Sequence, residues 1–271
     1  MNSSASDTPR HKMAAWKHAP FDRFMDYTRQ VHRLFHLTVH GIQILTTHDK
    51  LIEALVKYDD VVGGQNPTEA PSESGEASPD ARIEAAREEA AFARREAESD
   101  FHRLRAHTLL DLWGALEVLV EDIVVAWLGN VPELLDSEEV ARVRVPLGEF
   151  QRLDDEERLR FLARELRDKR TNLKAGSTRF EMMLAVVGLD GKVEEPLRRD
   201  LFEANQVRNV IAHRGGIADR QLLKACPWMS LRPGQPVPLG RAESNRYEMA
   251  VLNYVMTVLN RIRAADNLPP I

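Results

Sequence analysis

One helical pattern, running from about Asp80 to Leu128, constrains the fold of this chain more than any other feature. Its first half consists mainly of alanine, glutamate and arginine, which are strong helix formers. Arg105 interrupts the second half, and the Gly129-to-Pro132 segment stops the helix. The second half is amphipathic, with an apolar stripe of Phe101, Leu109, Leu112, Leu116, Val120, Ile123 and Trp127. Such a stripe needs other helices to cover it, so we expect an all-α fold.

The remaining apolar spacing completes a bundle of about five main helices. Helical patterns cover about 22–58, 154–170, 178–187, 194–213 and 242–264. Thr178 and Glu181 form a capping box at the start of one of these helices. No strand alternation of useful length occurs. The glycines and prolines of residues 214–240 predict a short loop or hairpin before the last helix.

The composition along the chain predicts one folded domain over residues 20–268, preceded by a disordered tail at 1–19. Residues 59–79 are rich in serine, glycine, proline and glutamate and have few apolar side chains. Such a segment cannot bury enough surface to offset its ordering entropy, so we expect a flexible linker there.

The formal net charge of −5 argues against binding nucleic acid through overall basic charge, although a local basic site remains open. The one cysteine, Cys226, excludes an internal disulfide and fits a reducing compartment. The N-terminus lacks the apolar core of a signal peptide. The most apolar stretch, Leu109 to Leu128, contains carboxylates, which makes a transmembrane helix unfavourable. We therefore expect a cytoplasmic protein that does not enter a membrane.

The most specific short pattern is the run Arg208-Asn209-Val210-Ile211-Ala212-His213, which Gly215 and Gly216 follow closely. An arginine can hold a phosphate, and a histidine can move a proton near neutral pH. This combination suits cleavage of a phosphodiester without a metal ion.

On a helical wheel, Arg208 projects among apolar residues, whereas Asn205, Asn209 and His213 share a polar stripe. Arg208 and His213 point about 140° apart, so a site built on them is more readily completed across a dimer than on one helix. A purely structural alternative stays open. In it, Arg208 pairs with Glu117 in an apolar environment, and His213 only interacts with the helix dipole at the helix end.

Residues 207–216 resemble the signature of HEPN domains (higher eukaryotes and prokaryotes nucleotide-binding), in which a polar residue often follows the arginine of an Arg-x4-6-His pattern. The long amphipathic helix that carries Glu117 also resembles that family, and the resemblance extends over residues 20–265. Many HEPN proteins are metal-independent endoribonucleases of toxin–antitoxin or antiviral systems. HEPN toxins paired with a small nucleotidyltransferase antitoxin usually have a tyrosine soon after the histidine. Arg214-Gly215-Gly216 stands there instead, which disfavours that subclass.

The resemblance implies RNA as the substrate, no metal or cofactor, and a homodimer in which two such motifs meet in one cleft. His213 would be the acid–base group for attack of the ribose 2′-hydroxyl on the adjacent phosphate, which gives cyclic-phosphate ends. Arg208 would bind the phosphate and stabilise its charge. Asn209 would orient a phosphate oxygen or the imidazole. An antitoxin or another component of a defence system is the further partner that the resemblance suggests.

Other polar residues are candidates for contact with the RNA backbone. Residues 169–179 are basic, contain no acid and include a helix N-terminus, although a solvated loop explains this composition equally well. We assign substrate contacts to Lys174, Arg179, Asn205 and Arg214.

His32, His36 and His40 are spaced by four residues along one side of the first helix. Such spacing can present imidazoles to zinc, but no carboxylate or cysteine completes a coordination set. A solvated histidine face is favoured, and contact with phosphate or RNA stays open.

Two functions are therefore expected from the sequence. The first is a dimeric HEPN endoribonuclease that acts as a toxin or defence effector. The alternative is a non-catalytic HEPN module that binds RNA, a nucleotide or a protein partner, in which Arg208 supports the fold or the dimer.

Overall fold

The computed structural model describes residues 13–63, 78–171 and 176–271. These residues form an all-α helical bundle without a β-strand. The α-helices are α1 (Ala15–Leu45), α2 (His48–Gly63), α3 (Pro79–Glu98), α4 (His102–Asn130), α5 (Glu138–Ala141), α6 (Leu147–Phe150), α7 (Asp155–Thr171), α8 (Ser177–Leu184), α9 (Glu195–Arg214), α10 (Arg220–Ala225) and α11 (Arg241–Ala265). Short 3₁₀ helices lie at Pro132–Leu134, Ala185–Val187 and Pro227–Met229.

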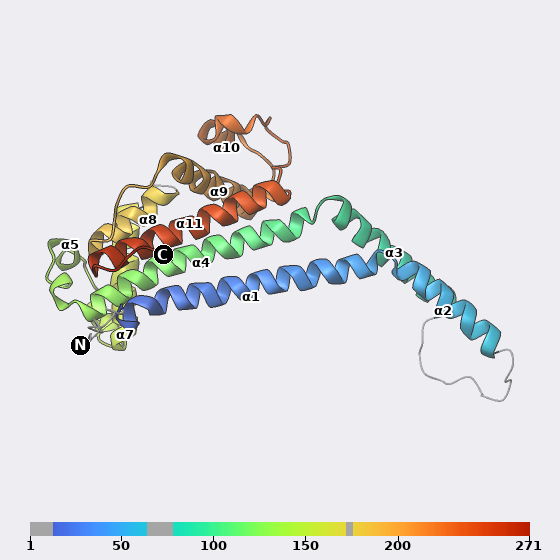
Figure 1. The fold of residues 1–271 in the computed structure, drawn as a ribbon, viewed down its shortest axis with the longest axis horizontal. Coiled ribbons are helices and arrows are strands. Elements are labelled where there is room, and N and C mark those ends of the chain that lie inside the picture. Colours follow the sequence, from blue (N-terminus) through green and yellow to red (C-terminus); the bar gives the residue numbers. More distant parts are fainter. Residues whose placement is uncertain (1–12, 64–77, 172–175) are drawn as a thin grey trace, which may run out of the picture.

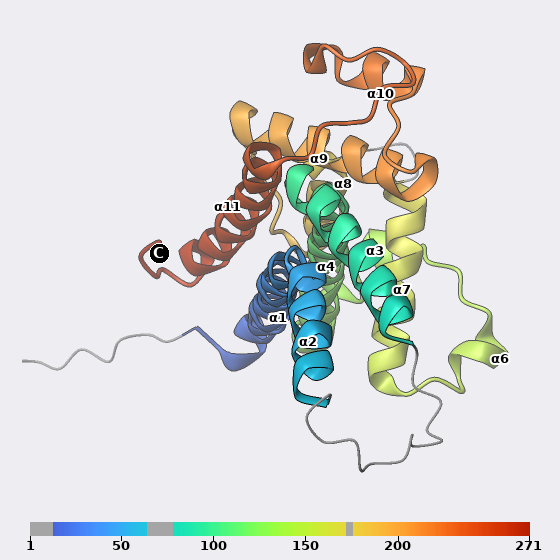
Figure 2. The same ribbon diagram turned by 90° about the vertical axis from the view of Figure 1, so that its right-hand side faces the viewer.

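Helix α4 is the centre of the bundle and contacts α1, α7, α8, α9 and α11. Its side chains Leu116, Ile123 and Val124 are fully buried. Helices α1, α4 and α11 run side by side, and α2 and α3 extend beyond them as an arm (Figure 1). The view along the bundle shows the other helices around α4 (Figure 2). No helix of the described segments is long and apolar enough to cross a membrane.

Several predicted boundaries change in the structure. Helix α1 begins at Ala15, so residues 15–19 are helical and do not belong to a tail. The apolar side chains of Met13 and Phe21 are buried in the core, which explains why order begins this early. Helix α2 continues to Gly63 and α3 begins at Pro79, so both ends of the predicted linker are helical. The rest of that prediction, residues 64–77, lies outside the described residues.

The helix predicted over residues 22–58 is two helices, α1 and α2. The hydroxyl groups of Thr46 and Thr47 donate to the carbonyl oxygens of Gln43 (2.6 Å) and Ile44 (3.2 Å), in competition with the helical backbone bonds. Thr46 itself keeps helical dihedral angles, φ −58° and ψ −19°, and the chain changes direction between α1 and α2 (Figure 1).

The long helix predicted over residues 80–128 is also two helices, α3 and α4, because Asp100 and Phe101 both have positive φ, 52° and 57°. Arg105, which interrupts the apolar stripe, holds this turn. Its Nε donates to the Asp100 carbonyl oxygen (2.8 Å), and its Nη2 donates to Asp100 Oδ1 (3.2 Å). Asp100 Oδ2 also accepts the N–H of Arg241 (2.7 Å), so the turn anchors the start of α11. Burial acts to raise the pKa of Asp100, but these bonds outweigh it and lower that pKa.

Residues 214–240 form an excursion before α11 that contains α10 and a short hairpin-like pairing. Ala218 donates to the Gln235 carbonyl oxygen (2.8 Å), and Val237 donates to that of Gly216 (2.8 Å). The pairing amounts to one antiparallel bridge, between Ile217 and Pro236. This agrees with the predicted loop or hairpin.

Candidate functional site

Helix α9 carries the Arg208–His213 run in its last two turns. The helix ends at Gly215, whose φ of 60° places it in the left-handed region that favours glycine. The amides of Gly215 and Gly216 both bond to the carbonyl oxygen of Val210, which closes the final turn. The position of the run at a helix end therefore follows directly from the two glycines.

Arg208 lies against Glu117 of α4, as the apolar surroundings of both residues predicted. Its Nη2 is 3.7 Å from Glu117 Oε2, and its Nη1 donates to Asn209 Oδ1 (3.1 Å). Its Nε is enclosed and has no acceptor. An enclosed donor without a partner is costly, and an external ligand cannot reach this one without a movement of its surroundings.

A second arginine reaches the same carboxylate. Arg179, in the first turn of α8, donates from Nη1 to Glu117 Oε1 at 3.3 Å, and Trp113 Nε1 donates to the same oxygen at 3.1 Å. The side chains of Arg208, Glu117 and Arg179 are 27%, 29% and 33% exposed. Two guanidinium groups and one carboxylate leave one net positive charge that solvent and an anion can reach. We call these three residues the arginine cluster.

His213 is exposed at the end of α9 and makes no hydrogen bond or ion pair with any described residue. It lies about 7.5 Å further along the helix axis than Arg208 and about 140° around it, by ideal helix geometry. Arg214 is also exposed, and its Nε lies 3.7 Å from Asp219 Oδ2. One chain thus presents the imidazole and the arginine cluster on different sides of α9.

Asn205 is buried between α9 and the start of α8. Its Oδ1 accepts the N–H of Gly176, the N-cap residue of α8, at 3.3 Å. Gly176 has φ 62°, and a Cβ there would lie 3.0 Å from the Cα of Phe202, so this close approach requires glycine. Asn205 therefore positions α8. It is buried, although the sequence predicted a polar stripe with Asn209 and His213 and a contact with the substrate.

Two other predictions concern the start of α8 and the residues just before it. The capping box of Thr178 and Glu181 is wrong, because α8 begins at Ser177 and Glu181 binds elsewhere. Its carboxylate accepts from Tyr254 Oη (2.7 Å) and from Arg261 Nη1 (2.9 Å), and so ties α8 to α11. Lys174, the remaining candidate for substrate contact, lies outside the described residues.

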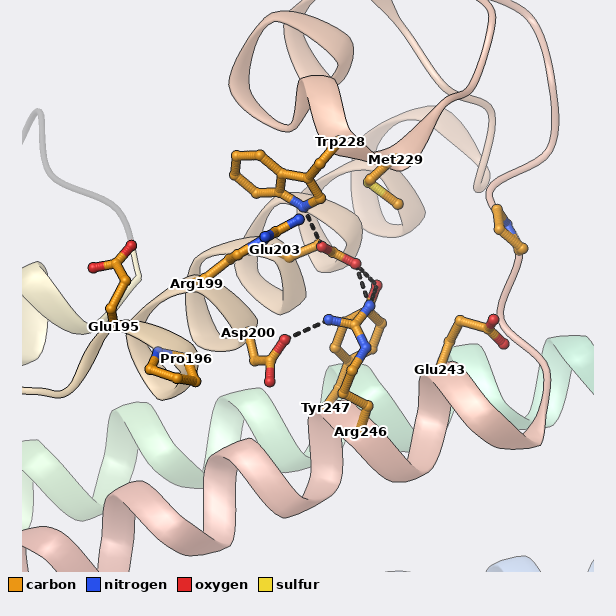
Figure 3. Close-up of a pocket in the computed structure, with 11 residues that line it drawn as sticks. Glu195, Pro196, Arg199, Asp200, Glu203, Trp228, Met229, Glu243, Arg246 and Tyr247 are labelled. Carbon is orange, nitrogen blue, oxygen red and sulfur yellow. Dashed lines mark hydrogen bonds and ion pairs between the residues drawn. The ribbon is translucent and has the colours of Figure 1, made fainter.

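Sequence reasoning missed a cavity of about 560 Å³ beside the first half of α9. Glu203 lies at its base with a side chain 5% exposed, and accepts hydrogen bonds from Arg246, Trp228 and Tyr247 (2.7 Å from Tyr247 Oη). Figure 3 shows the Arg246 guanidinium between Glu203 and Asp200, whose Oδ1 is 2.5 Å from Arg246 Nη1. Burial acts to raise the pKa of Glu203, but the three donors outweigh it and lower that pKa. The carboxylate therefore stays ionised.

A neighbouring cavity of about 440 Å³ lies toward α8. Its lining residues are Ser177, Thr178, Glu195, Arg198, Arg199, Phe202 and Trp228. The two cavities share Glu195, Arg199 and Trp228, so they flank the stacked pair of Arg199 and Trp228. The Arg199 guanidinium lies over the Trp228 ring at 4.5 Å and makes no ion pair with a described residue. A tryptophan in the glycine- and proline-containing segment 214–240 was the sequence signal for this feature.

The described residues contain no group of three or more histidine, cysteine, aspartate or glutamate side chains that could hold a metal ion. Of the three α1 histidines that are spaced by four residues, His32 pairs with Glu248 of α11 at 2.9 Å, and His36 meets the edge of Phe35. The chemistry of the candidate site therefore rests on guanidinium, carboxylate and imidazole groups.

Comparison of the chain with protein-family models, with curated proteins and with solved structures gives no match. The residues and their geometry are accordingly the basis for assigning a function.

Proposed function

We propose that the protein is a metal-independent endoribonuclease of the HEPN type that acts as a toxin or antiviral effector. One observation carries the proposal. A single run on α9 presents a partly exposed arginine, inside a cluster of net positive charge, and an exposed imidazole that no described residue pairs with. A phosphodiester needs these two groups for binding and for proton transfer.

In the proposed reaction, the ribose 2′-oxygen attacks the adjacent phosphorus and the bond from phosphorus to the 5′-oxygen breaks. The proton of the 2′-hydroxyl passes to the His213 imidazole, and the imidazolium so formed protonates the leaving 5′-oxygen. The products are a 2′,3′-cyclic phosphate and a 5′-hydroxyl. Arg208 and Arg179 stabilise the negative charge that builds on the phosphate oxygens.

Within one chain, His213 points away from Arg208. This supports a site formed by two copies, in which the imidazole of one copy acts on a phosphate bound by the arginine cluster of the other. Asn209 then orients Arg208 through the bond that it already accepts (3.1 Å).

The first turn of α8 supports a path for the RNA strand. Ser177 and Thr178 line the smaller cavity, and Arg179 of the same turn belongs to the arginine cluster. A strand bound at Arg208 therefore reaches Trp228 and Arg199 across this turn. A base can stack on the exposed part of the Trp228 ring, and Arg199 can contact its phosphate.

The test is incubation of single-stranded RNA with purified protein in EDTA, followed by analysis of the new ends. Wild type should produce cyclic-phosphate ends, and His213→Ala should lower the rate by about 10²–10⁴-fold, the usual contribution of an acid–base group. His107→Ala, which changes another exposed histidine, should retain the rate. Arg208→Ala should also lose cleavage, whereas Arg152→Ala, at an exposed arginine without a described ion pair, should not.

One observation favours the alternative, a non-catalytic module that binds RNA, a nucleotide or a protein. Glu117 already engages both arginines, which an ion-paired support would also require. Folded wild-type protein that binds RNA but leaves it intact would establish this alternative. Expression supplies an independent check: the wild type should arrest growth, and His213→Ala should relieve the arrest.

A further inference from the structure

An exposed seam runs along the second half of α1 and along α2, which belongs to the arm. Its residues are spaced alternately three and four apart. The seam consists of Leu34, Leu37, Gly41, Ile44, His48, Leu51, Leu55, Tyr58 and Val62. Leu34, Leu37, Ile44, Leu51 and Tyr58 are between 58% and 65% exposed, which is unusual for large apolar side chains. Such a repeat is the a/d pattern of a coiled coil.

The repeat crosses the break between α1 and α2 without losing register. His48 follows Gly41 by seven residues, and Leu55 follows His48 by seven. Thr46 itself retains helical dihedral angles. In Figure 1, α2 bends away from the line of α1 and extends beyond the bundle, so the seven-residue spacing is kept across a change of direction.

The rest of the molecule leaves the large apolar side chains of the seam exposed; His48 alone among the seam residues pairs with α3, at 3.0 Å from Glu89. Helix α3 pairs with α2 along another face, where Arg94 Nη2 is 2.7 Å from Asp49 Oδ2 and Arg87 Nη2 is 2.8 Å from Glu53 Oε1. The buried Val56 also lies on α2 outside the seam. These contacts fix α3 in place, so it is not available to cover the exposed leucines.

The apolar surface continues from the arm onto the bundle. Tyr27, seven residues before Leu34, is 45% exposed and lines a cavity of about 490 Å³ between α1 and α4. Val118 of α4 lies in the same cavity and is 58% exposed. A partner helix that follows the seam therefore also meets an apolar groove at the end of the arm.

We infer that this seam binds the same seam of a second copy of the chain, as a two-helix coiled coil. The pattern uses two positions in seven, which matches a helix–helix seam and is narrower than the broad apolar face of a helix that lies on a membrane. An isologous contact also needs no other partner, because each copy supplies both halves of the interface.

The exposed area approaches what a stable dimer buries. Burial of one large aliphatic side chain removes about 60–120 Å² of apolar surface, so a half-exposed one still offers roughly 30–60 Å². The seam has seven large apolar residues in each copy, so a pair of seams would bury roughly 400–850 Å² of apolar surface. A standard interface buries roughly 1,600 Å², slightly more than half of it apolar. Gly41 and His48 interrupt the aliphatic seam, and such positions select one register.

The mass in solution tests this inference independently of RNA cleavage. Sedimentation equilibrium of the wild type should give twice the chain mass of 30.8 kDa at about 20 µM protein. The double variant Leu37→Glu/Leu51→Glu should sediment as a monomer, with a dissociation constant raised by about 100-fold or more. Both positions are exposed, so the circular dichroism of the variant monomer should remain helical. Lys57→Glu, an equally exposed change on α2 outside the seam, should remain a dimer.

Three results would overturn the inference. A wild type that is monomeric at 100 µM has no such interface. A dimer that the double variant leaves unchanged uses another surface. A monomer that floats with vesicles of mixed neutral and anionic lipid, and loses this in the double variant, uses the seam for a membrane.

Discussion

Replacing Glu117 by glutamine distinguishes a phosphate-binding cluster from an ion pair that only joins helices. Glutamine keeps an oxygen that can accept from Trp113 Nε1, now at 3.1 Å, and removes the negative charge that Arg208 and Arg179 share. If the two arginines bind RNA, the carboxylate competes with phosphate for them. The substitution should then strengthen RNA binding while it weakens the fold slightly.

The magnitude follows from the distances. Unit charges 3.7 Å and 3.3 Å apart attract by about 4.5 and 5 kcal/mol at an effective dielectric constant of 20. Because the three side chains are 27–33% exposed, solvent screening reduces the net contribution to about 1 kcal/mol. Glu117→Gln should therefore lower the free energy of unfolding by about 1 kcal/mol. It should raise RNA affinity by a similar amount, or about fivefold.

The assay is fluorescence anisotropy with labelled single-stranded RNA, in a His213→Ala background that leaves the RNA intact. Binding should be measured across a range of salt concentrations, because each added phosphate contact steepens the salt dependence by about 0.7. Glu121→Gln is the matched control. Glu121 lies four residues further along α4, 3.1 Å from Arg167 and 4.0 Å from Arg164, and its substitution changes the net charge equally. Equal affinity changes in both variants, or no gain with Glu117→Gln, would refute the role of the arginine cluster.

Three further predictions test neighbouring features. Trp228→Ala should weaken RNA binding by about 1–3 kcal/mol through loss of a stacking surface. Trp228→Phe keeps an aromatic ring and should lose less binding free energy. Equal losses for the two variants in a gel-shift titration would argue against stacking. Glu203→Gln should cost about 2 kcal/mol at pH 7, because Arg246 keeps its ion pair with Asp200 but loses the charge of its buried partner. The pKa of Glu203 is lowered from an ordinary 4.5, so the stabilisation by its carboxylate is complete above that pH and is lost as the pH falls through the lower folded value. Acid titrations followed by circular dichroism should therefore show a shallower loss of stability in Glu203→Gln than in the wild type. Burial raises the pKa of Cys226 to about 12, so at pH 8 its thiol should react with Ellman's reagent only in denaturant. A fast reaction of the native protein would contradict the buried position of Cys226.

The fold class was predictable because apolar spacing dominates most of the chain. The patterns at 154–170, 194–213 and 242–264 correspond to α7, α9 and α11 within two residues. Glycine and proline mark the ends of these helices, as at Gly215. Local signals of this kind need no knowledge of the tertiary structure.

The two helix breaks were not predictable from such signals. Neither Thr46 nor Phe101 is a strong helix breaker, and no glycine or proline lies beside them. The turn at Asp100 depends on bonds from Arg105 and from Arg241, which is 141 residues away. Tertiary contacts of this kind outweigh helix propensity, which measures only local preference.

Some features of the candidate site were likewise predictable from local sequence signals, and others depend on tertiary contacts. The pairing of Glu117 with Arg208 was predictable because each charge lies on an otherwise apolar stripe, where it needs a partner. The participation of Arg179 in that pairing was not, because it depends on where α8 begins. The stacking of Arg199 on Trp228 joins α9 to a loop, and no periodic pattern indicates it.

The start of α8 is therefore the part of the fold on which the proposed site depends most. Arg179 reaches Glu117 from the first turn of this helix, and that turn is placed by the bond from Gly176 to Asn205. Asn205 is thus important for a reason other than the predicted one. The side chain of Asn205 is buried, yet it positions the second guanidinium of the arginine cluster through Gly176. Since Asn205 and Arg208 lie on the same helix, α9 supplies one arginine directly and positions the other.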